Sequence, residues 1–360
     1  MEEFHVGKIR LGIIGAGAIG NVHLTTFGKL LDEVEIIGIT DTYIPLAEQR
    51  AKEHGIQKVY HTAEELINED KIDAVIIGVP NKWHASLTIA ALKAGKHVLV
   101  EKPMGINSEA AKEIVRVQRE TGKIVMVAHQ MRWQWQIRQI KEQVEKGAFG
   151  KIYHAKTGWF RRKGIPGWGS WFTQKSEAGG GPLIDIGVHM LDLALYLMGN
   201  PKPISVYGAT YAEFGPKRKG IGNWGTPNWQ GVYDVEDLAT ALIKMDNGAI
   251  LSLEVSWAVN METSNNPFIH LMGSDGGASI NGNQAKILTE QFDRPIDIEL
   301  FPNENEIDER IYLSKHFIEC IRQEKEPITS AMSGLANNLI LDAIYESSKS
   351  GREVELDWNI

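Results

Sequence analysis

Cysteine is almost absent from the 360-residue sequence, which contains a single one, Cys320. One thiol cannot form an internal disulfide, so the sequence excludes a small secreted scaffold that is held together by disulfides. It also excludes zinc sites that are built from several cysteines. A chain of this length can bury a large hydrophobic core without such covalent support.

Long hydrophobic runs and an excess of basic charge are also missing. The longest strongly apolar stretches, such as AVIIGV at 74–79, are far shorter than the roughly 20 residues that cross a bilayer. The start MEEFHVGKIR has no basic region followed by an apolar segment, so we expect no signal peptide and predict a cytoplasmic protein. The formal net charge of -8 argues against binding to a nucleic-acid backbone. We therefore expect a small-molecule partner, with no nucleic acid, membrane or metal.

Short apolar runs alternate with helical patterns over the first 130 residues. The predicted strands lie at 8–14, 34–40, 73–79, 97–100 and 123–128. The helical patterns between them lie at 18–30, 45–54, 62–69, 84–94 and 107–121. Buried apolar strands separated by helices are typical of a parallel sheet that is covered on both faces. Residues 1–130 are therefore predicted to form an α/β domain.

The pattern changes after residue 130, where strands follow one another with turn sequences such as DNG (246–248) between them. The predicted strands lie at 152–161, 204–213, 238–245, 249–258, 268–272 and 277–281. One helix is expected within this series at 182–198, and two more follow near 308–324 and 331–349. Residues 131–360 are therefore predicted to form an α+β domain with an open, mostly antiparallel sheet.

A glycine-rich turn follows the first predicted strand and opens a predicted helix. Gly15, Gly17 and Gly20, with Ala18 and Ile19 between them, form the pattern G-x-G-x-x-G. The first glycine permits the tight turn, the second lets a pyrophosphate approach the backbone, and the third allows close packing of helix on strand. The helix start offers free N–H groups and the positive end of its dipole to phosphates. The turn therefore predicts a Rossmann-type dinucleotide site; a glycine turn without a ligand is the alternative.

Asp41 ends the second predicted strand and follows Gly20 by 21 residues. A carboxylate at this position accepts hydrogen bonds from the ribose hydroxyls of an adenosine and repels a 2′-phosphate. The next residues are Thr42 and Tyr43, so no arginine directly follows to bind such a phosphate. The sequence therefore favours NAD over NADP as the cofactor.

Lys102 stands in the sequence Glu101-Lys102-Pro103 at the end of the fourth predicted strand. Ligands of open parallel sheets bind at the carboxyl ends of the strands, so Lys102 is expected to point toward the cofactor. A buried lysine has a lowered pKa and can transfer protons. By position alone, a lysine in a surface loop is the alternative.

A second glycine-rich sequence, Gly179-Gly180-Gly181, precedes the helix predicted at 182–198. Asp185 and His189 are four residues apart, which places them on the same side of an α-helix. A histidine whose pKa is near the working pH is the usual general base. A capping aspartate with a core histidine is the alternative.

Together these segments resemble the Gfo/Idh/MocA family of sugar and inositol dehydrogenases. The resemblance rests on GAGAIG (15–20), Asp41, VPNKWH (79–84), EKP (101–103) and GGGPLIDIGVH (179–189), and it covers essentially the whole chain. It implies a Rossmann domain followed by an α+β domain, and it places the catalytic residues of the family at Lys102, Asp185 and His189. It also implies cofactor contacts from Pro80, Asn81, His84, Glu101 and Lys102. A helix cap is the alternative role of Asn81 and His84.

The resemblance implies an NAD-dependent oxidoreductase that oxidises a secondary hydroxyl of a sugar, an anhydrosugar or an inositol. His189 is expected to act as general base, and Lys102 to stabilise the developing oxyanion or to relay the proton. Asp185 is expected to orient the substrate or the base. Two alternatives remain: a glycosidase that uses NAD for a transient oxidation, and a non-catalytic sensor of NAD and sugars.

Candidate substrate contacts come from the start of the second domain and from the segments before the Asp185 helix. Tryptophan rings suit the apolar C–H faces of sugars, and charged side chains suit their hydroxyl groups. The segment 164–172 also resembles the corresponding loop of levoglucosan and glycoside 3-dehydrogenase-like members of the family. The candidate residues are Lys102, His129, Arg132, Arg161, Trp168, Trp171, Asp185 and His189.

The strands predicted in the second domain carry apolar residues on both faces. LATALIKM (238–245) and AILSLEVSW (249–257) are examples, and they have too many such residues for a sheet with one solvated face. We therefore expect a homodimer or homotetramer that is formed through this sheet.

Overall fold

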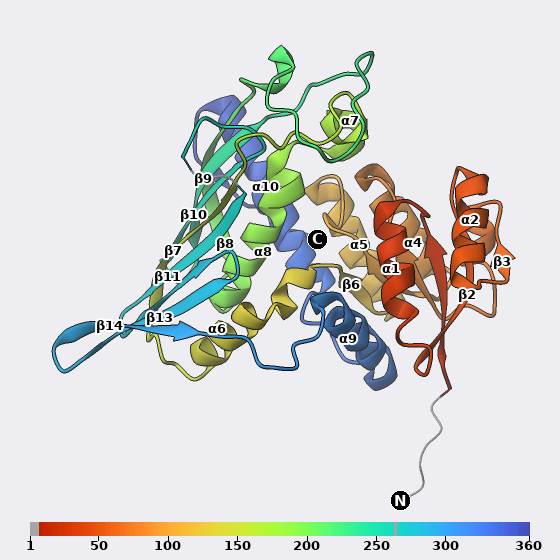
Figure 1. Cartoon of the computed structure of the whole chain (residues 1–360), viewed down its shortest axis with the longest axis horizontal. Coiled ribbons are helices and arrows are strands. Elements are labelled where there is room, and N and C mark those ends of the chain that lie inside the picture. Colours follow the sequence, from red (N-terminus) through yellow and green to blue (C-terminus); the bar gives the residue numbers. More distant parts are fainter. Residues whose placement is uncertain (1–6, 263–264) are drawn as a thin grey trace, which may run out of the picture. The chain divides into compact units, whose positions relative to one another are not determined.

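The structure is a computed structural model, and it describes residues 7–262 and 265–360. The described residues form two compact units. Unit 1 comprises those up to His129 together with Arg310–Leu335 and Ile360, and unit 2 comprises those of Gln130–Glu309 and Ala336–Asn359. Figure 1 labels the helices and strands of both units.

Unit 1 contains a six-stranded parallel sheet with the strand order β3-β2-β1-β4-β5-β6. Its strands are β1 (Ile9–Ile14), β2 (Val34–Thr40), β3 (Lys58–Val59), β4 (Ala74–Ile77), β5 (His97–Val100) and β6 (Val125–Val127). All four residues of β4 are buried, as expected for a parallel strand with helices on both faces of its sheet. The chain order reverses between β1 and β4, and ligands of doubly wound sheets bind at such a point.

Helices connect the strands of unit 1. They are α1 (Ala18–Phe27), α2 (Ile44–His54), α3 (Ala63–Ile67), α4 (His84–Lys93) and α5 (Ser108–Thr121), and the 3-10 turn η1 (Asn81–Trp83) precedes α4. Helix α9 (Glu309–Gln323) follows β14 in the chain, and from Arg310 on it also belongs to unit 1. Local sequence sets the ends of α5. The Asn107 side chain accepts a hydrogen bond from the N–H of Ala110 at 2.9 Å, and Gly122 ends the helix with φ at 64°.

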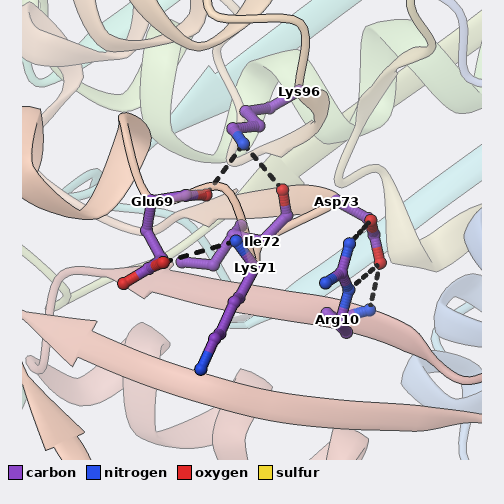
Figure 2. A network of polar contacts seen from close by, with 6 residues as sticks. All are labelled: Arg10, Glu69, Lys71, Ile72, Asp73 and Lys96. Atoms are coloured by element: carbon purple, nitrogen blue, oxygen red, sulfur yellow. Dashed lines mark hydrogen bonds and ion pairs between the residues drawn. The ribbon is translucent and has the colours of Figure 1, made fainter.

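A polar network holds the amino ends of the central strands of unit 1 (Figure 2). Both carboxylate oxygens of Asp73 accept hydrogen bonds from Arg10, at 2.9 and 2.6 Å. Lys96 is buried, and its Nζ donates to the carbonyl oxygens of Glu69 and Ile72 at 2.9 and 2.8 Å. These bonds satisfy a buried ammonium group and fix the edge of the sheet opposite the carboxyl ends of its strands.

Unit 2 contains a nine-stranded sheet with the order β14-β13-β12-β11-β7-β10-β9-β8-β15, in which only β7 and β10 pair in parallel. Its strands are β7 (Ile152–Phe160), β8 (Pro203–Tyr211), β9 (Leu238–Met245), β10 (Ile250–Ser256), β11 (Asn266–Gly273), β12 (Gly277–Asn281), β13 (Gln284–Gln291), β14 (Arg294–Leu300) and β15 (Val354–Glu355). In β9, buried Ala241 and Ile243 alternate with exposed Leu242 and Lys244. One face of the sheet therefore belongs to the core.

Helices α8 (Val188–Leu197) and α10 (Ala331–Ser350) supply the residues that face this sheet in the core of unit 2. Gly208 of β8 leaves room for Ile344 of α10, whose side chain lies 2.9 Å from the position of an added Cβ. The helical segment Lys175–Leu197 is long and apolar enough to cross a membrane, but 89% of its most apolar window is buried inside the protein. Its apolarity is thus used in the core.

The predicted fold class, a Rossmann domain followed by an α+β domain, is confirmed. Helix α6 (Trp135–Glu145) and the β13–β14 hairpin were not predicted. The two central residues of that hairpin, Phe292 and Asp293, have φ of 55° and 56°, although such a turn normally contains glycine or asparagine. The turn therefore has little sequence signal.

Residues 310–335 were assigned to the second domain by the sequence analysis, but they pack with unit 1. Arg322 of α9 forms an ion pair with Glu33 at 3.0 Å. The carbonyl oxygen of Thr329 accepts a hydrogen bond from the N–H of Val127 in β6 at 2.9 Å. Such contacts between residues far apart in sequence leave no pattern that a segment-by-segment analysis detects.

Candidate active site

The first glycine-rich turn connects β1 to α1. Gly15 has φ at 104°, and a Cβ at this residue would clash with the carbonyl oxygen of Gly78. A Cβ at Gly20 would clash with the carbonyl oxygen of Gly15. Both glycines are therefore required by the close approach of helix and strands.

Gly17 is the N-cap residue of α1, and unlike Gly15 and Gly20 it has room for a side chain. A Cβ built on Gly17 meets no described atom within 4 Å outside the adjacent residues, so packing within the protein does not require glycine here. No side chain caps the N-terminus of α1. An uncapped helix start beside a residue without a side chain is suited to an anionic group such as a pyrophosphate.

Asp41 directly follows β2, and its carboxylate is held beside the glycine turn. Oδ2 accepts a hydrogen bond from the N–H of Ala16 at 2.7 Å, and Oδ1 accepts one from the N–H of Tyr43 at 2.8 Å. Arg50 of α2, which the sequence analysis did not consider, also reaches the turn, since its Nε donates to the carbonyl oxygen of Ala16 at 3.4 Å. Its Nη1 forms an ion pair with Glu53 at 2.6 Å.

Glu101, at the end of β5, forms a buried pair with His23 of α1, at 2.9 Å between Oε1 and Nε2. Burial by itself raises the pKa of the Glu101 carboxyl. The hydrogen bond from His23 and the positive charges of His23, Arg310 and Lys102 outweigh burial and lower that pKa to about 2. Sequence analysis missed His23; its signal was a polar residue among buried positions of α1, three residues after Gly20.

His84 connects the loops that follow β4 and β5. Its Nδ1 lies 2.7 Å from the carbonyl oxygen of Pro103, and its Nε2 lies 2.8 Å from that of Val79. Burial lowers the pKa of the imidazole. Because both ring nitrogens are bound to the backbone, His84 positions the loop that carries Lys102. Pro80 and Asn81 lie between these loops at the start of η1.

The sequence predicts a helix over 182–198, but the segment with Asp185 and His189 is not a regular α-helix throughout. Leu183–Gly187 is a π-helical turn, and α8 begins only at Val188. Gly187 permits this turn to lie against β10, because an added Cβ would be 3.2 Å from the side chain of Val255. The segment is helical as expected, but it starts with a π turn, and π turns often occur at functional sites.

Asp185 lies in the π turn of unit 2, and its negative charge acts on Arg161 of the same unit. Asp185 Oδ2 accepts a hydrogen bond from Nε1 of Trp257 at 3.0 Å, and Trp257 is fully buried. Burial lowers the pKa of the Arg161 guanidinium, and the negative charge of Asp185 opposes this shift. His189 lies in α8 and is 8% exposed. Trp257 was missed because it is far from Asp185 in the sequence.

The second glycine-rich turn precedes this π turn and surrounds a carboxylate that sequence analysis also missed. Glu236 is buried, and its Oε1 accepts hydrogen bonds from the N–H groups of Gly181 and Leu183 at 3.0 and 3.1 Å. The hydroxyl of Tyr345 donates to the same oxygen at 2.9 Å. A Cβ at Gly180 would clash with that hydroxyl. Burial raises the pKa of Glu236, although these hydrogen bonds oppose it.

Both units of the chain resemble domains of a known protein family. Residues 9–129 match the model of an oxidoreductase family with an NAD-binding Rossmann fold, and residues 137–279 match the Gfo/Idh/MocA C-terminal domain. The chain belongs to the Gfo/Idh/MocA oxidoreductase family. The predicted resemblance is therefore confirmed, and the protein is an NAD-binding oxidoreductase.

Relatives in this family are similar over the whole chain. D-glucoside 3-dehydrogenase of Escherichia coli (strain K12) is 32% identical over 97% of both chains. The scyllo-inositol 2-dehydrogenase (NAD(+)) of Bacillus subtilis (strain 168) is 28% identical, also over 97% of both chains. The structure of levoglucosan dehydrogenase in complex with NADH and levoglucosan has a TM-score of 0.88, with 24% identity, and covers 98% of this chain and 100% of its own. The last likeness supports the fold.

The residues of unit 1 fit the NAD of this family. The open position at Gly17 and the start of α1 suit a pyrophosphate. The fixed carboxylate of Asp41 suits the hydroxyl groups of a ribose. Among residues 7–262 and 265–360, no group of three or more His, Cys, Asp or Glu side chains could hold a metal ion.

Three of the predicted substrate contacts have partners within unit 2. Arg132 is buried and forms a bidentate ion pair with Asp192, at 2.7 and 2.6 Å. Trp168 is 5% exposed, and its Nε1 donates to the carbonyl oxygen of Gly215 at 2.7 Å. Trp171 is half-buried beside Phe172. His129, also predicted, is buried at the end of unit 1.

Proposed function

We propose that the protein oxidises a secondary hydroxyl group of a sugar, an anhydrosugar or an inositol, with NAD as hydride acceptor. The observation that carries the proposal is the local structure of unit 2, where the Asp185 carboxylate is fixed by Trp257, acts electrostatically on Arg161 and shares a helical segment with His189. The family relatives support it, since two of them are named for oxidation of a glucoside and of an inositol.

The proposed roles follow from what hydroxyl oxidation requires. A carbinol loses hydride readily only when its O–H proton leaves as well, so a base is needed at the oxygen. His189 takes this proton. Lys102 donates a hydrogen bond to the same oxygen and stabilises its developing negative charge. Bound NAD accepts the hydride from the carbinol carbon.

Asp185 and Arg161 orient the substrate in this proposal. The indole N–H of Trp257 holds the Asp185 carboxylate in one position, which lowers the entropy that substrate binding loses. Arg161 stacks on Trp159, at 4.8 Å from its ring centre, and donates to substrate hydroxyls. The buried ion pair of Arg132 with Asp192 makes Arg132 a positioning residue for α8. Trp168 similarly supports its loop.

The proposed cofactor contacts are those of the first turn and of the strand ends. Gly17, Ala18 and Ile19 offer backbone N–H groups to the pyrophosphate, and Asp41 accepts hydrogen bonds from the adenosine ribose. Asp41 repels a 2′-phosphate, which favours NAD over NADP. Pro80, Asn81 and Glu101 lie at the carboxyl ends of β4 and β5, on the nicotinamide side.

The His189→Ala variant tests the proposed base. We expect kcat to fall by about 10²–10⁴-fold, the usual contribution of general base catalysis, with the Kd for NAD within twofold of wild type. NADH fluorescence over inositols, hexoses, 1,6-anhydrosugars and glucosides measures turnover, and His61→Ala, which removes an exposed histidine of unit 1, is the matched control. Full activity of His189→Ala would remove this residue from the mechanism. Net NADH accumulation by wild type separates a dehydrogenase from a glycosidase that recycles its NADH and from a sensor without turnover.

The proposed partner of the protein is a second copy of the same chain, bound through the outer face of the unit 2 sheet. Tyr207 and Tyr211 of β8 and Leu242 of β9 are each about half-exposed, and Tyr207 is directly opposite Leu242. An exposed apolar group of this size on a sheet is typical of an interface. Light scattering at micromolar concentration tests this, and a monomer would contradict it. The cytoplasmic location stays a prediction.

A further inference from the structure

Two loops of unit 2, residues 161–174 and 212–237, are joined along their backbones. Ile165 and Gly222 form one end of the junction, where the N–H of Gly222 donates to the carbonyl oxygen of Ile165 at 2.9 Å. The N–H of Gly167 donates to the carbonyl oxygen of Trp224 at 2.9 Å. A Cβ at Gly231 would clash with the first loop. The two loops therefore form one closely packed layer with a defined conformation.

This layer carries aromatic side chains that are unusually exposed for their size. Trp224 is 56% exposed and Trp229 is 50% exposed, whereas tryptophan is normally well buried. We call Trp171, Phe172, Trp224 and Trp229 the aromatic shelf. Next to the two exposed rings in the sequence, the loop presents mainly small and amide-bearing residues, and Val232 is an exposed aliphatic residue nearby in the same loop. The small and amide-bearing residues are Asn223, Gly225, Thr226, Asn228 and Gln230.

Neighbouring side chains of the same two loops hold the exposed rings in place. Trp229 stacks on buried Trp168, with ring centres 5.7 Å apart. The Arg218 guanidinium lies 4.9 Å from the Trp168 ring centre and 5.7 Å from that of Trp229, and it donates to the Trp229 carbonyl oxygen at 3.2 Å. Phe172 meets Trp224 edge to face at 4.6 Å. Rings that are ordered in advance lose little entropy when a ligand stacks on them.

The loops that carry the shelf contact residues near Asp185 within unit 2. A Cβ at Gly164, where the first loop begins, would lie 2.6 Å from Cδ of Arg161 and 3.1 Å from the carbonyl oxygen of Trp257. A Cβ at Gly222 would lie 2.9 Å from Cα of Gly164. The same Trp257 binds Asp185 through its indole. The loops of the shelf therefore start beside the residues proposed to orient the reacting sugar.

We propose that the aromatic shelf binds the part of a glycoside that lies beyond the oxidised ring, either a second sugar or an aryl aglycone. This inference rests on the proposed function and names its substrate class: glycosides rather than free monosaccharides. Flat aromatic faces pack on the C–H faces of a sugar, and neighbouring amide groups bind its hydroxyls. Binding of another protein to the same rings is an outcome that the test below distinguishes.

The test compares substrates that share the reacting ring: D-glucose, methyl β-D-glucopyranoside, cellobiose and phenyl β-D-glucopyranoside. In Trp224→Ala and Trp229→Ala we expect kcat/KM for the last two to fall at least tenfold, mainly through KM, and that for D-glucose to change less than twofold. Trp224→Phe is expected to recover part of the loss, because it restores an aromatic face. Tyr153→Ala removes a similarly exposed aromatic side chain elsewhere in unit 2. It is expected to leave kcat/KM unchanged for every substrate.

Equal losses for all four substrates, or no loss for any, would overturn the proposal. So would a changed oligomeric state in light scattering with unchanged kinetics, since the shelf would then be a protein interface. If wild type oxidises none of these four compounds but does oxidise an inositol or a 1,6-anhydrosugar, the shelf proposal fails while the proposed function stands. If it oxidises nothing in the whole NADH screen, the proposed function fails, and calorimetry of the NAD-loaded protein with cellobiose tests the shelf separately. Binding that both Trp→Ala variants lose supports the shelf, and the absence of binding by wild type at 10 mM, which is roughly a −3 kcal/mol limit, rejects it.

Discussion

Two glycine-rich turns in this protein begin helical segments, and they treat the helix N-terminus in opposite ways. The turn at Gly15–Gly20 leaves α1 without a capping side chain, and Gly17 has open space where a Cβ would be. At Gly179–Gly181 the N–H groups of Gly181 and Leu183 instead bind the buried carboxylate of Glu236.

The difference shows how one local pattern serves two purposes. Both helix starts attract negative charge, because their first N–H groups lack partners within the helix. In our proposal, the cofactor supplies that charge at the first turn, so the turn binds a ligand. In the second turn a buried carboxyl oxygen of Glu236 accepts the hydrogen bonds of these N–H groups, so the turn holds the segment with Asp185 and His189 in place. Four predictions test this distinction.

The largest effect is expected for Gly181→Ala. The new Cβ would clash with the backbone carbonyl oxygen of Glu236, which cannot move aside as a flexible side chain can. We expect the free energy of unfolding, measured by urea denaturation, to fall by about 3 kcal/mol. Stability within about 0.5 kcal/mol of wild type would mean that the second turn has room for a side chain, as the first turn has at Gly17.

The next effect concerns the buried carboxyl near the first turn. The pKa of Glu101 is lowered from 4.5 to about 2, so its stabilising contribution is complete above the unfolded pKa and is lost as the pH falls through about 2. The unfolding free energy of wild type minus that of Glu101→Gln should reach roughly 3 kcal/mol near pH 6 and decrease toward pH 2. A difference that does not depend on pH would contradict the pairing with His23.

Glu236 should show the opposite dependence on pH. Its pKa is raised, so its ionisation destabilises the folded state, and this penalty grows as the pH rises above the unfolded pKa. Relative to wild type, Glu236→Gln should therefore become more stable as the pH rises from 4 to 7. Glu236→Ala, which leaves the N–H groups of Gly181 and Leu183 without their acceptor, should lose about 2 kcal/mol. Thermal denaturation measures the stability of both variants. Equal stability of Glu236→Gln and Glu236→Ala at each pH would show that hydrogen bonding is not the function of Glu236.

The smallest effect is expected for Gly17→Ala, and it concerns binding rather than stability. A methyl group at this position meets no described atom within 4 Å, so unfolding should change by less than about 1 kcal/mol. The same methyl group would stand where the pyrophosphate approaches, and the Kd for NAD should rise at least tenfold, about 1.4 kcal/mol. Calorimetry measures the affinity. Unchanged NAD affinity would show that the first turn does not contact the cofactor closely.

Much of unit 1 could be predicted from the sequence because its signals are local. Buried runs such as AVII in β4, the three glycines and Asp41 each have a meaning within a few residues. The family resemblance added Lys102, Asp185 and His189 as the proposed catalytic residues. The hairpin β13–β14 was missed because its turn, Phe292-Asp293, has positive φ without glycine.

The sequence alone determined the fold class and the glycine turn, because periodicity and glycine spacing are properties of neighbouring residues, and its resemblance to known sequences indicated the family. Only the tertiary structure decided which distant side chains bind the residues of the proposed site. His23 reaches Glu101, Trp257 reaches Asp185, and Glu236 reaches Gly181 across 78, 72 and 55 positions of the chain, respectively. The physical reason is that a buried polar group takes whichever partner the packed core brings within hydrogen-bond distance, and the distance along the chain does not limit that choice.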